Sequence, residues 1–591
     1  MLNRTVQDTI ILLEEGNRLS WKTAGRYDRV YVYSGDFRNA TRISDDIMNQ
    51  EGHHSIYYRA GREIDRVYGH YAGKDETGVL NEIFKDERAH AGIKKTVLLA
   101  LGGLFHSLRL AENFIRQYNI REPIDFIPAS FPYSLYRIVV EKKGLLSERI
   151  RIPEEYIRAM KRREGVMNAV SRAKLIAYPV WILLNMGMRL RAPAGDRKYR
   201  YGICVWNSWI DSAPAPCRMD FLTGEDCLGP ENALYIIDGP VTKQNLSKVR
   251  GNGYPCLYFK NMIREYSGLS YLKRMFGSHL KACAQCFSLC RHNKSVLAQS
   301  YLRAMQSYIL WEVFCSLYTV ERFITLQEPG NVYRTLIQKN HGAKCLFVFW
   351  STSYDIVYRE DDSTHTDSYY SHMVYDEAIS SLMSNEYLKR NNNIIGRYVN
   401  VGMLRSDGVF RMRHDAALKS AMKKELGIPA DKKIIGFFDT TVGRTGMFTN
   451  HEGLKMLEDV YRFLDSSPEC FMLFRTRGHY ELCDDDRVRK SFARLIGHPR
   501  VLCINTAARS YYAYDVMGVC DLVIGAFTGS APLESVAGGV RTLCYTPERF
   551  KQGAFVITSF PGFCVSNFIE LKNNADYWLY RCGEDDFSGF Q

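Results

Sequence analysis

Residues 521–545 read DLVIGAFTGSAPLESVAGGVRTLCY and contain an apolar strand, a turn of small residues and a short helix. The apolar strand ends at Ile524, and the turn runs on to Ser530. Pro532 stands in the first turn of the expected helix, where a missing N–H costs little, and two glycines end that helix before a new strand begins. This order of elements predicts a β-α-β unit of a parallel sheet.

The turn in this unit suits a diphosphate. The N–H groups at the start of the helix and the positive end of its dipole face the turn, and Gly529 permits close approach of the backbone. Thr528 and Ser530 add hydroxyl donors, and Glu534, one turn into the helix, is placed to accept hydrogen bonds from a ribose. The alternative is an ordinary strand–turn–helix in which Ser530 caps the helix for stability.

Polar or small residues also follow other predicted strands of the C-terminal half. They are Asp439, Thr440, Thr441, Arg475, Arg477, His479 and the stretch 401–407 (VGMLRSD). The carboxyl ends of parallel strands meet at one edge of a sheet, and ligands bind there near a topological switch point. Several such strand ends together favour the ligand-binding interpretation of the turn at Gly529.

The whole chain alternates strand and helix signals, which predicts an α/β protein with parallel sheets. Its 591 residues exceed one ordinary core, so we expect at least two domains. The turn at 327–330 (QEPG) is the expected boundary. The expected parts are residues 1–330 with a basic helix (154–191) and a helical region (271–324), residues 331–565, in which 375–389 is expected to be a helix, and a tail (566–591).

Four segments in order, VGMLRSD, LGIPADKKIIGFFDTT, FMLFRTRGH and YDVMGVCDLVIGAFTGSAPLESVAGGVRTLCY, carry a resemblance to a known family. They resemble the donor domain of GT-B glycosyltransferases, most of all surface-polysaccharide enzymes such as the CDP-glycerol glycerophosphotransferase group and capsule sugar transferases. The resemblance covers about residues 345–547. It implies two Rossmann-like domains facing a cleft. The C-terminal domain would bind a nucleotide-activated donor, and the N-terminal domain would bind a glycan or lipid-linked acceptor.

The resemblance also implies roles for single residues. Thr440 and Thr441 would line the donor phosphates, and the diphosphate and ribose would be held by Thr528, Gly529, Ser530 and Glu534. Arg475, Arg477 and His479 stand where the family usually has Lys-Pro-His-Pro, and Phe438-Asp439 stands where Ala-Pro is common. These departures leave the donor open. Such a site needs no metal and no cofactor besides the donor, because fixed cations and backbone dipoles stabilise the leaving phosphate.

A transferase also needs a general base for the acceptor hydroxyl. Asp36 follows the first N-terminal strand, His106 lies on a helix after two glycines, and Asp362 and His365 lie in an acidic loop. Each of these four residues also has an ordinary structural explanation, such as a solvated loop.

Residues 154–191 form a long basic segment, expected to be a helix kinked at Pro179. Its apolar run, 175–188, contains Tyr178 and Trp181 and is shorter than the roughly 20 residues that span a bilayer. The flanking cations are Lys161, Arg162, Arg163, Arg172, Lys174, Arg189 and Arg191. Two interpretations stay open: a helix lying in the interface of an anionic membrane, or a core helix with basic ends.

The net charge of +13 indicates an anionic partner, but no zinc finger, RRM or basic heptad pattern indicates nucleic acid. The N-terminus does not read as a secretory signal, so the 16 cysteines predict reduced thiols in the cytoplasm. A basic interfacial helix would place the protein at the inner face of the plasma membrane. Cys283, Cys286, Cys290 and His292 have a spacing that a metal site can use, but their apolar neighbours favour a buried helix face.

These observations predict a glycosyltransferase that moves a sugar or polyol phosphate from a nucleotide-activated donor to a surface-polysaccharide acceptor. Two alternatives remain. One is a nucleotide-sugar epimerase with the same two-domain plan, and the other is a membrane-surface scaffold that keeps the fold without the chemistry.

Overall fold

The computed structural model describes the chain in segments, and all structural statements concern these. They are residues 10–15, 27, 29–34, 41–42, 74–128, 132–137, 148–186, 197–205, 229, 231–237, 253–258, 262–263, 266, 268–292, 294–326, 331–349, 370–391, 393–443, 448–476, 480–483, 485–505, 511, 513–526, 529–547 and 562–583.

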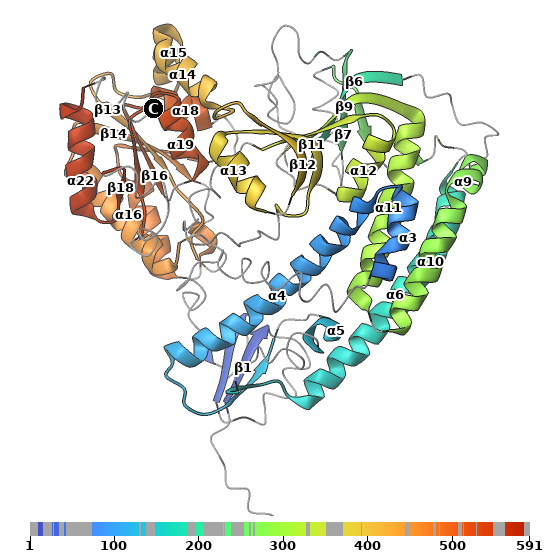
Figure 1. Cartoon of the computed structure of the whole chain (residues 1–591). Coiled ribbons are helices and arrows are strands. Elements are labelled where there is room, and N and C mark those ends of the chain that lie inside the picture. Colours follow the sequence, from blue (N-terminus) through green and yellow to red (C-terminus); the bar gives the residue numbers. More distant parts are fainter. Residues whose placement is uncertain are drawn as a thin grey trace, which may run out of the picture.

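The described strands form three sheets, and every strand pair in them is parallel (Figure 1). The sheets have five, seven and six strands, in the orders β3-β2-β1-β4-β5, β12-β11-β10-β9-β6-β7-β8 and β15-β14-β13-β16-β17-β18. In each, the first three strands run outward in one direction and the fourth returns to the other side of the first. This is the order of a doubly wound sheet, with a switch point between the first and fourth strands.

The five-stranded sheet is built from the N-terminal residues. Its strands are β1 (Ile10–Glu15), β2 (Arg29–Ser34), β3 (Thr41–Arg42), β4 (Ile124–Ile127) and β5 (Ile150–Arg151). We expected two Rossmann-like units; the α/β class with parallel sheets is confirmed, and this small sheet is an additional one.

The seven-stranded sheet crosses residue 330, where we expected a domain boundary. Its strands are β6 (Arg197–Val205), β7 (Ala233–Ile237), β8 (Cys256–Tyr258), β9 (Tyr318–Leu326), β10 (Lys344–Val348), β11 (Val374–Ser380) and β12 (Ile394–Asn400). In its middle, Cys345 of β10 pairs with Phe323 of β9. The expected turn at 327–330 lies outside the described residues, and the strands on either side of it belong to one sheet. The division into domains itself stays a prediction.

Helices cover one face of this sheet in a thick layer around a common core. They are α3 (Lys74–Phe84), η2 (Glu87–Ala89), α4 (His90–Gln117), α5 (Tyr133–Tyr136), α6 (Glu154–Asn185), α9 (Gly268–Arg274), α10 (Phe276–Arg291), α11 (Ser295–Leu317), α12 (Val332–Asn340) and α13 (Leu382–Arg390). The expected helical region 271–324 is wrong in its last part, because β9 begins at Tyr318. Residues 375–380 are likewise a strand and not a helix. Both stretches become buried in the sheet, and this burial outweighs their weak helical pattern.

The six-stranded sheet forms a separate C-terminal layer. Its strands are β13 (Lys433–Phe438), β14 (Cys470–Thr476), β15 (Val501–Asn505), β16 (Leu522–Ala526), β17 (Thr542–Tyr545) and β18 (Cys564–Val565). Figure 1 shows helices on both of its faces. One face carries α14 (Ser406–His414), α15 (Ala416–Glu425), α18 (Ala513–Val519) and α19 (Ser530–Ala537); the other carries α16 (Asn450–Asp465), η7 (Tyr480–Leu482), α17 (Asp486–Ile496), α22 (Phe568–Asp576) and η8 (Tyr577–Arg581).

The described part of the C-terminal tail packs on this six-stranded sheet. Trp578 and Leu579 lie in the core beneath α16, and the Arg541 guanidinium donates to the carbonyl oxygens of Trp578 and Cys582, both at 2.8 Å. The tail therefore stabilises the C-terminal layer as far as residue 583.

Among the described helices, none has both the length and the apolar character that crossing a bilayer requires. α6 continues through Pro179 and ends at Asn185, where Met186 is already extended; residues 187–191 of the expected helix lie outside the described residues.

Candidate active site

The switch point of the six-stranded sheet lies between β13 and β16. Phe438, the last residue of β13, pairs with Arg475 on one side and with Gly525 on the other. Neighbouring strands are about 4.8 Å apart, so the Cα atoms of Arg475 and Gly525 lie roughly 10 Å from each other. The chain leaves β13 and β16 at the same edge, which places the residues after Phe438 beside the start of α19.

The loop after β13 is tied to the neighbouring strand by a charged hydrogen bond. The Thr476 hydroxyl donates to a carboxylate oxygen of Asp439 at 3.1 Å, and Thr476 is buried. Thr440 is also buried, and Thr441 is half-buried. Sequence reasoning missed Thr476, although it stands between the two arginines that were singled out.

The same loop then folds back before α16 begins. The Gly443 N–H donates to the Phe448 carbonyl at 2.9 Å, and the Phe448 N–H donates to the Thr441 carbonyl at 3.2 Å. Gly443 has a backbone φ of +97°, a value that residues other than glycine rarely adopt. Thr449 caps α16 in a reciprocal capping box with Glu452. Thr440 and Thr441 are therefore held at the sheet edge between a strand and a firmly capped helix.

α19 starts close against the end of β16. A Cβ atom on Gly525 would lie only 2.5 Å from Cγ of Pro532, so glycine is required for this approach. Gly529 is the N-cap residue, and it contributes no side-chain hydrogen bond to the first turn. The alternative in which Ser530 caps the helix is wrong, since Ser530 is already its first helical residue. α16, α17 and α22, by contrast, all have a capping side chain.

Arg475 and Glu534 are two charged residues that were predicted to lie near this helix start and that the structure describes. Nη1 of Arg475 donates to the carbonyl oxygen of Tyr511 at 3.1 Å, which directs the guanidinium toward the connection between β15 and α18. Glu534 is buried within α19. The structure thus places both residues on the α19 face of the sheet.

Asp439 also sets the electrostatics of the sheet edge. Burial raises the pKa of the Tyr480 hydroxyl well above its ordinary value, and the nearby carboxylate of Asp439 adds to this effect. Burial likewise raises the pKa of the Cys503 thiol, with the charges of Asp439 and Glu481 as further causes. Both groups therefore stay neutral beside Asp439 at neutral pH.

Several predicted site residues fall outside the described residues. They are Asp36, Asp362, His365, Arg477, His479 and Thr528. His106 lies in the middle of α4, and only its backbone is described. The predicted general bases and the second half of the β14 strand end therefore stay predictions.

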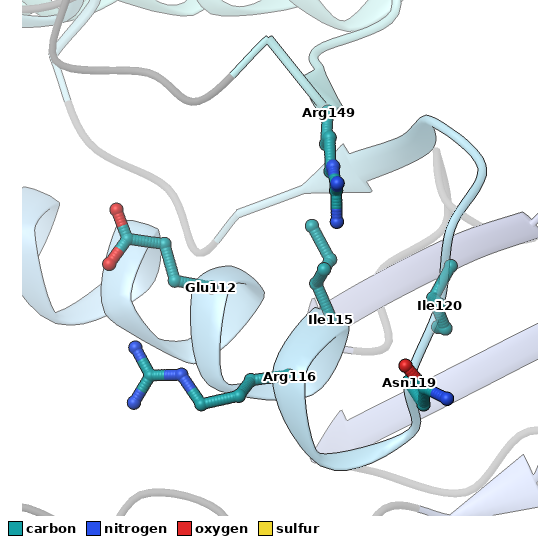
Figure 2. A pocket seen from close by; sticks show the side chains of 6 residues that line it. All are labelled: Glu112, Ile115, Arg116, Asn119, Ile120 and Arg149. Carbon is teal, nitrogen blue, oxygen red and sulfur yellow. The ribbon is translucent and has the colours of Figure 1, made fainter.

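A hollow of about 480 Å³ lies elsewhere, beside the five-stranded sheet (Figure 2). It is lined by Glu112, Ile115, Arg116, Asn119, Ile120 and Arg149. These residues belong to the end of α4, the turn after it and the residue before β5, so the hollow lies at the amino edge of that sheet. Ligands of parallel sheets bind at the carboxyl edge, and we therefore do not assign the donor to this hollow.

The cysteine cluster of α10 packs as an apolar helix face. Cys286 and Cys290 are buried in the core, and Cys283 packs against it. Burial raises the pKa of Cys283 to about 11, which keeps that thiol protonated. No group of three potential metal ligands occurs within the described part of the chain. The core interpretation of these cysteines is confirmed by their burial.

No protein-family model matches the chain, and no curated protein matches it. Solved structures are similar at low identity. The wall teichoic acid polymerase TagF shares 13% identity at a TM-score of 0.40, over 72% of this chain and 91% of that one. The UDP-GlcNAc 2-epimerase from Neisseria meningitidis, bound to UDP-GlcNAc, shares 10% identity at a TM-score of 0.37, over 66% of this chain and 94% of that one.

A third similar structure is Anabaena HepE in complex with UDP and glucose, with 11% identity and a TM-score of 0.35 over 65% of this chain and 90% of that one. The similar structures thus include a wall teichoic acid polymerase and a nucleotide-sugar epimerase, which the sequence analysis considered as the predicted class and as its alternative. At TM-scores below 0.5, however, the likeness carries no argument about what this chain does.

Proposed function

We propose that this chain is a glycosyltransferase-like enzyme that binds a nucleotide-activated donor at the carboxyl edge of its six-stranded sheet. The observation that carries the proposal is the juxtaposition at the switch point. There the loop Asp439–Thr441 lies beside the start of α19, whose N-cap residue is a glycine without a capping side chain. Backbone N–H groups and the helix dipole at such a position favour a diphosphate.

The proposed chemistry is a displacement. The acceptor hydroxyl oxygen forms a bond to the activated carbon, or to phosphorus if the donor is a CDP-polyol. The bond to the leaving nucleotide breaks, and its electron pair stays on the phosphate oxygen. The start of α19, together with Arg475 and Arg477, would stabilise the growing charge without a metal or further cofactor. The hydroxyl proton would go to a base, for which Asp36, His106, Asp362 and His365 are the candidates.

The proposed acceptor is a surface polysaccharide or a lipid-linked glycan, and the proposed place of action is the inner face of the plasma membrane. The net charge of +13 supports attraction to an anionic surface. The basic helix α6 is the element that sequence reasoning assigned to this surface.

The donor site is tested by removing one backbone donor from α19 without weakening the helix. Proline is favoured at the first helical position, so Ser530→Pro removes the N–H of Ser530 and keeps α19. Ser530→Ala is the matched control, because it removes the hydroxyl alone. Isothermal titration with CMP, CDP, UDP and GDP should show binding of at least one nucleotide to the wild type. We expect Ser530→Pro to weaken it by about tenfold or more, as for a lost hydrogen bond to a charged group.

Equal affinity of the wild type and Ser530→Pro would place the donor elsewhere. Binding of none of the four nucleotides would instead favour the non-catalytic scaffold. Product analysis separates the remaining alternative: an epimerase isomerises its nucleotide sugar, whereas a transferase releases free nucleotide only when an acceptor is present.

A further inference from the structure

α6 exposes an apolar face over its C-terminal half. Large apolar side chains on this face are exposed to solvent, with Leu184 at 80%, Val166 at 61% and Ile176 at 56%. We call this set the α6 apolar face: Val166, Val170, Ile176, Val180, Trp181 and Leu184. Between residues 165 and 184 the only exposed charged side chain on the helix is Lys174. A water-soluble surface helix normally places charged residues at such positions.

The opposite side of the same helix is occupied by the protein core. Leu175 and Ile182 are fully buried, and the ring of Tyr178 stacks between those of His279 and Trp181. Tyr178 therefore does not belong to the exposed aromatic pair that the sequence suggested, and Trp181 alone faces outward. Because the core already holds one side of α6, the exposed apolar side is left for something outside the described fold.

A second helix extends the apolar surface. α9 approaches the end of α6 so closely that a Cβ atom on Gly268 would lie 3.6 Å from Cδ2 of Leu183. Leu269 and Leu272 of α9 are themselves exposed, at just over 40%. Figure 1 shows α6, α9 and α10 along the outer edge of the molecule, on the side away from the six-stranded sheet.

Basic side chains border this surface. Arg162, Arg163 and Lys174 of α6 are exposed, and so are Lys273 and Arg274 at the end of α9. Arg172 is not one of them: its guanidinium lies over the ring of Phe287, 5.9 Å from the centroid, and is half-buried against α10. The apolar strip is complementary to the acyl chains of a bilayer, and its basic border is complementary to anionic headgroups.

We infer that the α6 apolar face, together with Leu269 and Leu272, inserts into the outer part of an anionic bilayer while α6 lies in the membrane plane. The inference rests on the proposed membrane association and deepens it, since it makes apolar insertion, and not charge alone, the basis of binding. The strip from Val166 to Leu184 is roughly 27 Å long at 1.5 Å per residue, which suits a helix that lies on a membrane and does not cross it.

Flotation of the full chain with vesicles tests this inference. Wild type is compared with the triple variant Ile176→Ser, Val180→Ser, Leu184→Ser and with a matched control, Leu99→Ser, Leu382→Ser, Ile569→Ser, whose targets are also exposed apolar side chains. The vesicles are phosphatidylcholine alone or phosphatidylcholine with phosphatidylglycerol. We expect wild type and control to float with the anionic vesicles and the α6 variant to lose at least about tenfold in partitioning.

Quenching by lipids brominated on their acyl chains adds a readout of insertion. Trp fluorescence of the wild type should be quenched, and this quenching should fall in Trp181→Phe. Flotation of the α6 variant equal to that of wild type, or no quenching difference in Trp181→Phe, overturns the inference. A concentration-dependent dimer in sedimentation that the α6 variant abolishes also overturns it, in favour of a second copy of this chain. Nucleotide titration of the same variants reports on the donor site separately, because that site lies on another layer.

Discussion

The six-stranded and seven-stranded sheets have the same strand order and differ at their carboxyl edges. In the seven-stranded sheet, β7, β9 and β10 end in the buried apolar residues Ile237, Leu326 and Val348, whereas β11 and β12 end in Ser380 and Asn400. In the six-stranded sheet, β13 leads into Asp439 and Thr440 and β14 ends at Thr476, with a hydrogen bond between the two strand ends. The shared topology creates an edge at which ligands bind in such folds, and the side chains at the strand ends decide which sheet is equipped for an anion.

The largest difference between the two sheets should appear in nucleotide binding, when a tightly packed glycine in each sheet is replaced by alanine. Gly525→Ala places a Cβ atom 2.5 Å from Pro532 at the start of α19, and Gly202→Ala places one 2.9 Å from Val320 within the seven-stranded sheet. Overpacking should lower the free energy of unfolding of both variants by about 1–3 kcal/mol. Only Gly525→Ala should also abolish nucleotide binding, because it displaces α19. Urea unfolding and titration calorimetry measure the two effects. A normal nucleotide affinity in Gly525→Ala would contradict the assignment of the donor site to the start of α19.

Two buried threonines give a sharper contrast, because only one of them has a hydrogen-bond partner in the described part of the chain. Thr476 donates to Asp439, whereas the Thr325 hydroxyl of β9 is buried without a hydrogen-bond partner among the described residues. Thr476→Val should lower the free energy of unfolding by about 1.5–3 kcal/mol, the range for a hydrogen bond to a charged group. Thr325→Val should be neutral or stabilising, since it removes an unpaired hydroxyl. Equal losses of unfolding free energy for the two variants in chemical denaturation would mean that the hydrogen bond between Thr476 and Asp439 does not stabilise the fold.

The sequence was most informative for the C-terminal sheet. Each of its strands from β13 to β17 is a short apolar run that ends in a polar or small residue or is followed directly by one, so the strand positions and the ligand-binding edge could be predicted from the pattern. The pairing of Arg475 and Gly525 with the same residue was not accessible, because register depends on contacts between distant segments. Thr476 was missed for this reason.

Side-chain direction was the other limit. The membrane interpretation of residues 154–191 counted Tyr178 and Arg172 among its interfacial residues, but the packing of α10 against α6 turns both toward the core. A helix with apolar and basic residues predicts contact with a membrane, but its sequence does not show which face of the helix packs against the protein core. In β11 the helical pattern of residues 375–380 was misleading, because strands buried in a parallel sheet lack alternation.

A smaller effect concerns the charge of Asp439. Burial raises the pKa of Cys503, and the carboxylate of Asp439 raises it further. Asp439→Asn should therefore lower the Cys503 pKa, so that alkylation of this thiol begins at lower pH. Cys345 in the seven-stranded sheet is the internal control, because its raised pKa arises from burial and from Asp376. Mass spectrometry of alkylated peptides across a pH series measures both thiols, and an unchanged Cys503 profile would contradict the proximity of Asp439.

A last comparison takes one tyrosine from each sheet and concerns stability at alkaline pH. Burial raises the pKa of Tyr398 in β12 from 10.0 to about 12, with Glu386 as a further cause. A raised pKa means that the folded state holds its proton longer, so this contribution to stability is complete below pH ~10 and is lost as pH rises toward ~12. Tyr398→Phe should therefore flatten the loss of unfolding free energy in that window and change little at neutral pH.

Tyr545 in β17 should behave differently, although burial raises its pKa too. Its hydroxyl donates to the Asp459 carboxylate at 2.7 Å, so Tyr545→Phe removes a hydrogen bond that Tyr398→Phe does not. We expect Tyr545→Phe to lower stability already at neutral pH, by about 1.5–3 kcal/mol. Urea unfolding at neutral and alkaline pH separates the two cases. Similar curves for both variants would mean that burial alone governs the two tyrosines and that Asp459 adds nothing to the six-stranded sheet.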